Sequence, residues 1–319
     1  MRPTTARLVY ALGTRDDQRT LAWVDTEGQA EPIAMPPGAY MYPRLSPDGG
    51  RVAIDGRGTG NDIWIWDFQS ETRTRFTVGP EGGTYPVWTP DGSRLAFETE
   101  EAHIYWKASN NTGTAEPLLE RPGRERTQAP SPYFFSPDGT ALVYRDAANP
   151  ETGDDLRMVP VDDPETPVWA LADSSNERNA SLSPDGRWMA YQAEERGVAQ
   201  VFVRPFPQVD DDLVQVSSDG GYDPVFSPDG RELYYLSHEG AMTAVSVDVT
   251  AGRFGFGERR TLFPFLWLAQ VPGRTFDVGP DGRFLVVDPS AGSPDGVTEP
   301  RLTVVLHWTE ALREQVPVE

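Results

Sequence analysis

A four-residue turn sequence recurs six times along this 319-residue chain. Its full form is Ser-Pro-Asp-Gly, and the variants replace only the first residue, by Thr or Gly. The copies occupy residues 46–49, 89–92, 136–139, 183–186, 227–230 and 279–282, and they begin 43, 47, 47, 44 and 52 residues apart. A short apolar run follows each copy. A period of this length, built from strands without helices, indicates a β-propeller or a related repeat fold.

The turn sequence has a specific backbone chemistry, shown here for residues 183–186. Pro184 fixes φ as the second position of a type I turn requires, and the hydroxyl of Ser183 can bond the turn's N–H groups. Gly186 supplies the positive φ of a bulge that restores strand twist. We therefore expect a structural role for the six turn aspartates, which are Asp48, Asp91, Asp138, Asp185, Asp229 and Asp281.

The runs between the turns predict four short strands in each repeat. Such an antiparallel sheet has two apolar faces and buries both only when several sheets stand radially around an axis. We predict an all-β fold, a single β-propeller domain of four-stranded antiparallel blades over residues 1–319. The repeat units are approximately 1–40, 41–83, 84–130, 131–177, 178–221, 222–273 and 274–319.

The number of blades is open between seven and six. The length divided by the period slightly favours seven, with both chain ends forming short separate blades. In the alternative, N-terminal strands complete the last blade of six as a clasp, and about two strands are left over. Arg44 and Asp277 stand two residues before the first and last turns, so they can meet only in a six-bladed ring.

Composition excludes several classes of partner and site. The net charge is −21, so nucleic acid and anionic lipid surfaces would be repelled. The absence of cysteine excludes disulfides and thiolate sites. No apolar run is long enough for a signal peptide core or a membrane helix. As encoded, the chain is expected in the cytoplasm without membrane insertion.

The sequence carries no catalytic or metal-binding motif. It lacks the Gly-x-Ser-x-Gly elbow of hydrolases. Its three histidines, His103, His238 and His307, are not at metal-ligand spacing, and its acidic runs do not match a calcium loop. We therefore predict that the chain is not an enzyme and holds no cofactor or metal.

The repeated Tyr-Pro-x-x-Ser-Pro-Asp-Gly unit resembles the WD40-like repeats of TolB-type propellers. Several stretches resemble more closely the C-terminal propeller region of bacterial serine/threonine protein kinases: residues 19–25, 61–67, 176–179, 203–207 and 303–308. The resemblance implies a sensor or protein-docking module. No kinase core is present in this sequence, and the incomplete first repeat favours a fragment, which would be extracytoplasmic in a membrane-anchored kinase. The alternatives are a TolB-like periplasmic scaffold and a propeller separated from a prolyl-oligopeptidase-like hydrolase.

The remaining candidate site is one mouth of the central channel, where the innermost strands begin. The residues expected there are Tyr42, Arg44, Tyr85, Asn179, Tyr222, Asp223, Thr275 and Asp277. Aromatic, amide and charged groups at a concave mouth suit a protein, a peptide or a small ligand. The tyrosines could equally well pack between blades, and the sequence favours neither reading.

Overall fold

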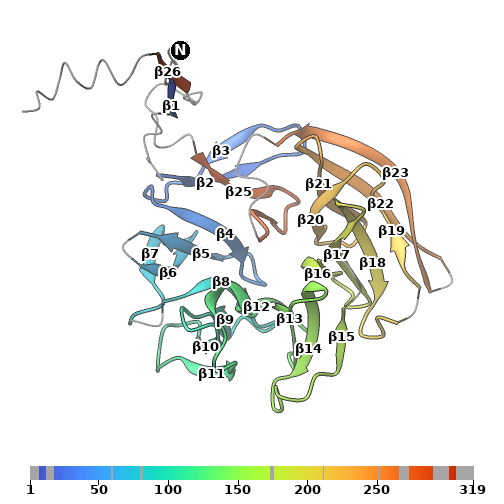
Figure 1. Ribbon diagram of the computed structural model, residues 1–319, viewed down its shortest axis with the longest axis horizontal. Helices are drawn as coiled ribbons and strands as arrows, with labels where there is room; N and C mark the ends of the chain where they lie inside the picture. Colours follow the sequence, from blue (N-terminus) through green and yellow to red (C-terminus); the bar gives the residue numbers. More distant parts are fainter. Residues whose placement is uncertain are drawn as a thin grey trace, which may run out of the picture.

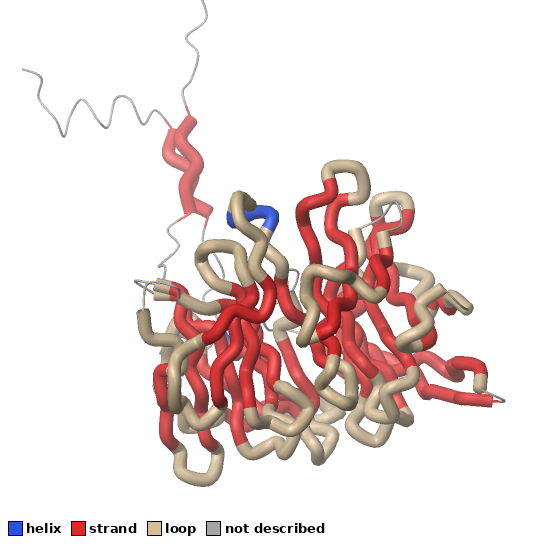
Figure 2. The backbone as a smooth tube through the Cα atoms, turned by 90° about the horizontal axis from the view of Figure 1, so that it is seen from below, coloured by secondary structure: helices blue, strands red, loops and turns tan. Residues whose placement is uncertain are grey.

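The computed structural model describes residues 7–11, 18–58, 60–79, 82–172, 176–210, 212–250, 252–265, 273–289 and 302–306. Six four-stranded antiparallel sheets surround a central axis as the blades of a propeller (Figure 1). In Figure 2 the ring is seen from its side. The one short helix described, the 3₁₀ helix η1 (Arg126–Gln128), stands in the connection between the second and third blades. The prediction of an all-β propeller of four-stranded blades is confirmed.

Each blade runs from an innermost strand to an outermost one. The first three blades are β4 (Tyr40–Leu45), β5 (Arg51–Arg57), β6 (Asn61–Asp67) and β7 (Thr72–Arg75); β8 (Thr84–Trp88), β9 (Arg94–Glu98), β10 (Ile104–Ala108) and β11 (Glu116–Leu119); and β12 (Ser131–Phe135), β13 (Ala141–Asn149), β14 (Gly153–Pro160) and β15 (Trp169–Leu171). The last three are β16 (Arg178–Leu182), β17 (Trp188–Glu195), β18 (Val198–Pro205) and β19 (Val214–Gln215); β20 (Gly221–Phe226), β21 (Glu232–Ser237), β22 (Ala241–Thr250) and β23 (Arg253–Pro264); and β24 (Phe276–Val278), β25 (Phe284–Asp288), β2 (Thr20–Val24) and β3 (Ala30–Pro32).

The sixth blade takes strands from both ends of the chain and so closes the ring. Its inner strands β24 and β25 are C-terminal, and β2 pairs with β25 in antiparallel register, Ala22 opposite Val286. The ring therefore has six blades with an N-terminal clasp, and the slight preference for seven is corrected. Counting by length misleads because two strands stand outside the ring. These are β1 (Arg7–Ala11) and β26 (Leu302–Leu306), which pair with each other in a separate two-stranded sheet.

The junction between the last and first blades gives the contact expected of a six-bladed ring. The backbone N–H of Leu45 donates to the Asp277 carboxylate at 2.9 Å, and the guanidinium of Arg44 donates to the Arg274 carbonyl at 3.0 Å. On the turn face, a Cβ added at Gly49 would lie 2.6 Å from the ring of Pro280. The first and last turns are thus in close contact.

The repeated turns have the geometry that their residues favour. In the third copy, the Gly139 N–H donates to the Ser136 carbonyl at 2.8 Å, and the Ser136 hydroxyl donates to Asp138 at 2.6 Å. Hydrogen bonds, first from Ser136 and then from Thr140, lower the pKa of Asp138 to about 2. All six turn glycines have positive φ, between 67° and 83°.

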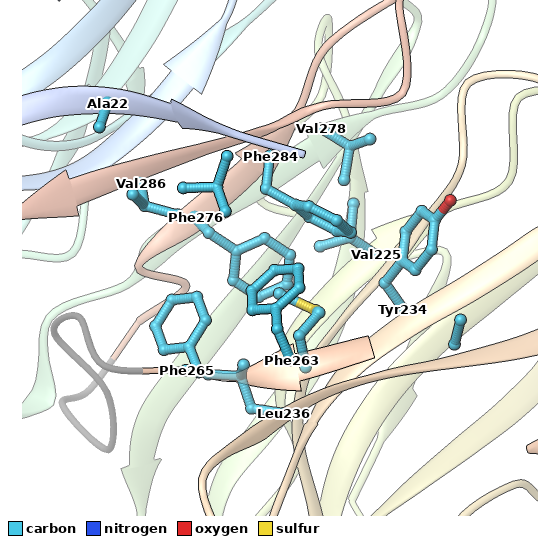
Figure 3. Close-up of a cluster of buried hydrophobic side chains, with 13 residues drawn as sticks. Ala22, Val225, Tyr234, Leu236, Phe263, Phe265, Phe276, Val278, Phe284 and Val286 are labelled. Atoms are coloured by element: carbon cyan, nitrogen blue, oxygen red, sulfur yellow. The ribbon is translucent and has the colours of Figure 1, made fainter. Parts of the chain in front are cut away.

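The hydrophobic core lies between the blades. Figure 3 shows the cluster between the fifth and sixth blades, where rings from both meet. Phe284 is fully buried, and its ring centroid lies 4.9 Å from Tyr234 and 5.5 Å from Phe263, in edge-to-face geometry. Each blade therefore buries its faces against its neighbours, as the apolar runs predict.

A second kind of contact joins neighbouring blades close to the axis. Four innermost strands carry a residue with φ between 52° and 54°: Tyr42, Tyr85, Asn179 and Asp223. Each lies at a β-bulge, where the strand register shifts. A bulge leaves a backbone N–H outside the ladder, and a buried N–H needs another acceptor.

A side chain of the preceding blade supplies that acceptor. The N–H of Tyr85 donates to Asp55 at 3.0 Å, and the N–H of Asp223 donates to Gln192 at 3.0 Å. We call each such contact an inter-blade bond. Asp55 and Gln192 occupy the same position in their blades, six residues after the turn glycine.

Two other junctions preserve the inter-blade bond with different partners. The acceptor position is occupied by Arg145 in the third blade and by Leu236 in the fifth. Neither side chain can accept a hydrogen bond. There the acceptor comes from the innermost strand: the Tyr133 hydroxyl bonds the N–H of Asn179, and the Asp223 carboxylate bonds the N–H of Thr275.

The second junction also departs from the pattern, because the third blade has a proline at its strand start. Pro132 has no N–H, and the preceding blade's Glu98 accepts the Ser131 hydroxyl instead, at 2.6 Å.

Of the three histidines, His307 lies outside the described residues.

The inter-blade bonds predict the effect of replacing Gln192 with the residue that the fifth blade carries at this position. Gln192→Leu leaves the Asp223 N–H without its acceptor, and leaving one buried donor unsatisfied costs about 1–3 kcal/mol. Denaturant unfolding should show that loss in the free energy of unfolding. The exposed Gln208→Leu is the control and should change little. An unchanged midpoint for Gln192→Leu would contradict the role of this bond.

Candidate functional site

A cavity of about 490 Å³ lies near the axis, between innermost strands and the turns that follow them. The turn prolines Pro47, Pro90, Pro137 and Pro184 are among its lining residues. Its walls combine large apolar side chains, among them Trp88, Tyr133, Phe134 and Leu182, with three charged side chains, Arg44, Arg274 and Asp277. A concave, mostly apolar space with a few polar groups is the usual form of a ligand site.

Arg44 is the most buried of the charged groups, with 9% of its surface exposed. Its guanidinium donates to two carbonyls, of Pro43 at 2.7 Å and of Arg274 at 3.0 Å. The Arg44 carbonyl accepts the indole N–H of Trp88 at 3.0 Å. Burial, with the neighbouring charge of Arg274, lowers the pKa of Arg44 to about 9.

Arg274 and Asp277 form the ion pair of the cavity, at 3.2 Å. Asp277 has a second task, because it accepts the Leu45 N–H. The charged part of the cavity is therefore assembled across the junction between the sixth and first blades.

Tyr42 and Tyr85 stack on each other at the starts of their strands. Their ring centroids are 4.5 Å apart, and Tyr42 is 1% exposed. The chain crosses this pair at Gly273, where an added Cβ would lie 2.7 Å from Tyr85 and 2.8 Å from Tyr42. Gly273 therefore packs against both rings, and the two rings pack between blades.

Asn179, Asp223 and Thr275 follow one another around the ring. The Asn179 amide donates to both Asp223 and Gln192, at 2.5 and 3.0 Å, and the Asp223 carboxylate bonds the Thr275 N–H. All three candidates are at most 4% exposed. They serve inter-blade bonds and present little surface to a ligand.

Burial raises the pKa of Asp223 to about 7, although Arg44 and Arg274 act in the opposite direction. Burial also raises the pKa of Asp55 well above its ordinary value. The Asp223 carboxyl is therefore only partly ionised near neutral pH.

The eight predicted site residues separate into three groups. Arg44 and Asp277 line the cavity. Four others, Tyr42, Asn179, Asp223 and Thr275, are buried at the blade junctions, and Tyr85 is half-buried beside them. Tyr222 is half-buried, and its hydroxyl is 2.9 Å from Nδ1 of His238. The sequence analysis missed Arg274, Tyr133 and Phe134, although the last two occupy the same inner-strand segment as the candidates in other blades.

No group of three histidine or carboxylate side chains comes together as metal ligands within the described part of the chain. Over the same residues, no helix is long and apolar enough to cross a membrane.

Comparison with known proteins gives a partial match in sequence. No known family model matches the chain. The uncharacterized peptidase YuxL of Bacillus subtilis (strain 168) is 27% identical over 207 residues. That match covers 61% of this chain but 29% of YuxL, so it spans less than a third of that protein.

Solved structures match over most of the chain. A protein from Agrobacterium tumefaciens assigned to TolB superimposes with a TM-score of 0.62 at 16% identity, over 85% of this chain and 98% of the other. TolB from Acinetobacter baumannii gives 0.58 at 21% identity, over 80% and 65%. These identities establish the fold alone. The chain has a TolB-like β-propeller fold, and the resemblance to kinase propellers stays a prediction.

The raised pKa of Asp223 predicts a pH-dependent stability. Its folded-state pKa lies above the ordinary 3.8, so the folded protein binds this proton more tightly than the unfolded chain does. Stability should therefore fall as the pH rises from about 4 to 7, by at most about 4 kcal/mol at about 1.4 kcal/mol per pKa unit. Asp223→Asn should flatten that dependence in thermal unfolding.

The exposed Asp212→Asn is the matched control and should retain the dependence of the native protein. If Asp223→Asn and the native protein lose stability in parallel over this range, the assignment to Asp223 fails.

Proposed function

We propose that this propeller is a non-catalytic binding module whose axial cavity receives part of a protein or peptide partner. The observation that carries the proposal is the cavity on the turn face. Its volume falls in the range of about 300–1,000 Å³ that ligand pockets occupy. Its aromatic walls would supply contact area, and its charged groups would orient the bound segment.

The rigidity of the rim favours binding over chemistry. Four turn prolines and strand-borne aromatic side chains lose little conformational freedom when a ligand binds. The charged groups are arginines and a carboxylate already engaged in structural bonds. None has the nucleophile–base geometry that hydrolysis requires.

The wider setting that we propose is a bacterial signalling protein of the serine/threonine kinase type, with the propeller as sensor or docking region. The kinase-like stretches of the sequence support it. The partial match to YuxL favours a second candidate, the propeller of a peptidase-like protein. Sequencing the reading frame on both sides of the coding region separates the two. A kinase catalytic loop supports the first setting, and a Gly-x-Ser-x-Gly elbow supports the second.

The proposed binding predicts that filling the cavity abolishes it. The immobilised chain is incubated with a pool of synthetic random hexapeptides, and retained peptides are identified by mass spectrometry. Leu182→Trp places a larger side chain in the cavity wall and should reduce retention at least about tenfold, the effect of losing about 1.4 kcal/mol. Retained peptides should be recovered uncleaved.

Leu213→Trp is the matched control, because Leu213 is 51% exposed and lies outside the cavity lining. It should retain peptides as the native chain does. Retention that is absent from the native chain, or unaffected by Leu182→Trp, contradicts the proposal, and cleaved peptides contradict its non-catalytic part.

A further inference from the structure

Arg44 is a buried cation without an anionic partner at bonding distance. Its guanidinium donates only to carbonyl oxygens, and it forms no ion pair with a carboxylate of the described residues. Removing a guanidinium from water is costly unless a counter-charge or several hydrogen bonds replace the water. A cation held in this way beside an open cavity is a place where an anion would be stabilised.

Arg274 adds a second positive charge at the same place. Its carbonyl is bonded to Arg44, so the two residues are adjacent. Its ion-pair partner among the residues that the structure describes is Asp277, which also accepts the Leu45 N–H. The Arg274 Nε is buried and has no acceptor within the described part of the chain. Donor capacity therefore remains on this guanidinium.

The local charge contrasts with that of the whole protein. Two guanidinium groups face one close carboxylate at the cavity, in a chain of net charge −21. Asp223 and Asp55 act on Arg44 from beyond ion-pair distance, and burial raises the pKa of both. The cavity is thus a positive site in an acidic protein, which favours an anionic group over a cationic one.

The walls restrict what can carry that anionic group. Tyr133, Phe134 and Leu182 line the cavity with the charged residues, and the prolines of the turns form its rim. A free phosphate or another small inorganic anion would leave these apolar surfaces unused. A carboxylate matches the planar fork of a guanidinium, and an apolar group attached to it would contact the aromatic rings.

The direction of entry favours the end of a chain. Four turn prolines line the cavity, while at the strand starts Gly273 packs against Tyr42 and Tyr85. A peptide that enters between the turns meets the arginines before this packed region. Its chain therefore ends at the arginines.

We propose that the cavity binds the free C-terminal carboxylate of a peptide, with the carboxylate on Arg44 and Arg274 and the last side chain against Tyr133 and Phe134. This inference rests on the proposed function, because it names the ligand class of the same cavity.

The test uses two pools of N-acetylated random hexapeptides, identical except that one ends in a free carboxylate and the other in an amide. Retention on the immobilised full chain is measured by mass spectrometry. The carboxylate pool should be retained about tenfold more strongly, as expected for charge-assisted hydrogen bonds, with apolar residues enriched at the last position. Arg274→Gln should reduce the preference to about one.

Arg231→Gln is the matched control, because the Arg231 side chain is 85% exposed and outside the cavity. It should keep the preference. Arg44→Gln should lose it as well. Because Arg44 also bonds two carbonyls, its replacement can affect folding, and Arg274→Gln keeps the test decisive. Circular dichroism and thermal unfolding confirm that each variant is folded.

Several outcomes overturn the inference. Equal retention of the two pools, still lost in Leu182→Trp, refutes carboxylate recognition and leaves the proposed function standing. Enrichment of amidated peptides with an internal Asp or Glu assigns the site to side-chain carboxylates instead. A preference that persists in Arg274→Gln places recognition elsewhere. If neither pool is retained by the native chain, both this inference and the proposed function fail.

Discussion

The inter-blade bond is the interaction on which the inner part of this propeller depends. A bulge on an innermost strand turns the backbone N–H of a non-proline residue out of its own sheet, and that N–H must find an acceptor in a buried place. The preceding blade supplies it, through Asp55 for Tyr85 and through Gln192 for Asp223. Where the usual position holds Leu236, the Asp223 carboxylate performs the same task for Thr275. The bond is preserved while the residues that form it change. This indicates that the constraint is the need of the bulged backbone N–H for an acceptor, whichever side chain supplies it.

This constraint explains why buried polar groups lie near the axis. Asn179, Asp223 and Thr275 are at most 4% exposed, and their bonds are made to neighbouring blades. A carboxyl in this position loses its water, so its pKa rises, as Asp223 shows. Polar composition near a propeller axis therefore does not by itself identify a ligand site. The cavity differs because Arg44 and Arg274 are among the residues that line it.

The sequence predicted most of the fold and only part of the site. The turn at residues 46–49 and its five counterparts predicted the blades, since Pro and Gly fix the backbone of each turn locally. The blade count could not follow from length, because β1 and β26 use residues outside the ring. The positions of Arg44 and Asp277 predicted the blade count better than length did, since their strands are neighbours only in a six-bladed ring. The polar residue found six positions after five of the six turn glycines was a signal in the sequence from which the acceptors could have been predicted. Arg274 carried no such signal, because its place depends on the path of the chain between the fifth and sixth blades.

The charged part of the cavity exists only when the ring is closed. Arg44 is near the start of the chain and Arg274 near its end, 230 residues apart, and they meet because the sixth blade combines strands from both termini. A ligand that bridges the two arginines would contact the first and last blades at once. Binding to the closed ring, and not to an opened one, stabilises closure by mass action. Occupancy of the cavity and integrity of the clasp are in this way coupled through the same junction, with Asp277 holding the Leu45 N–H on one side and Arg274 on the other.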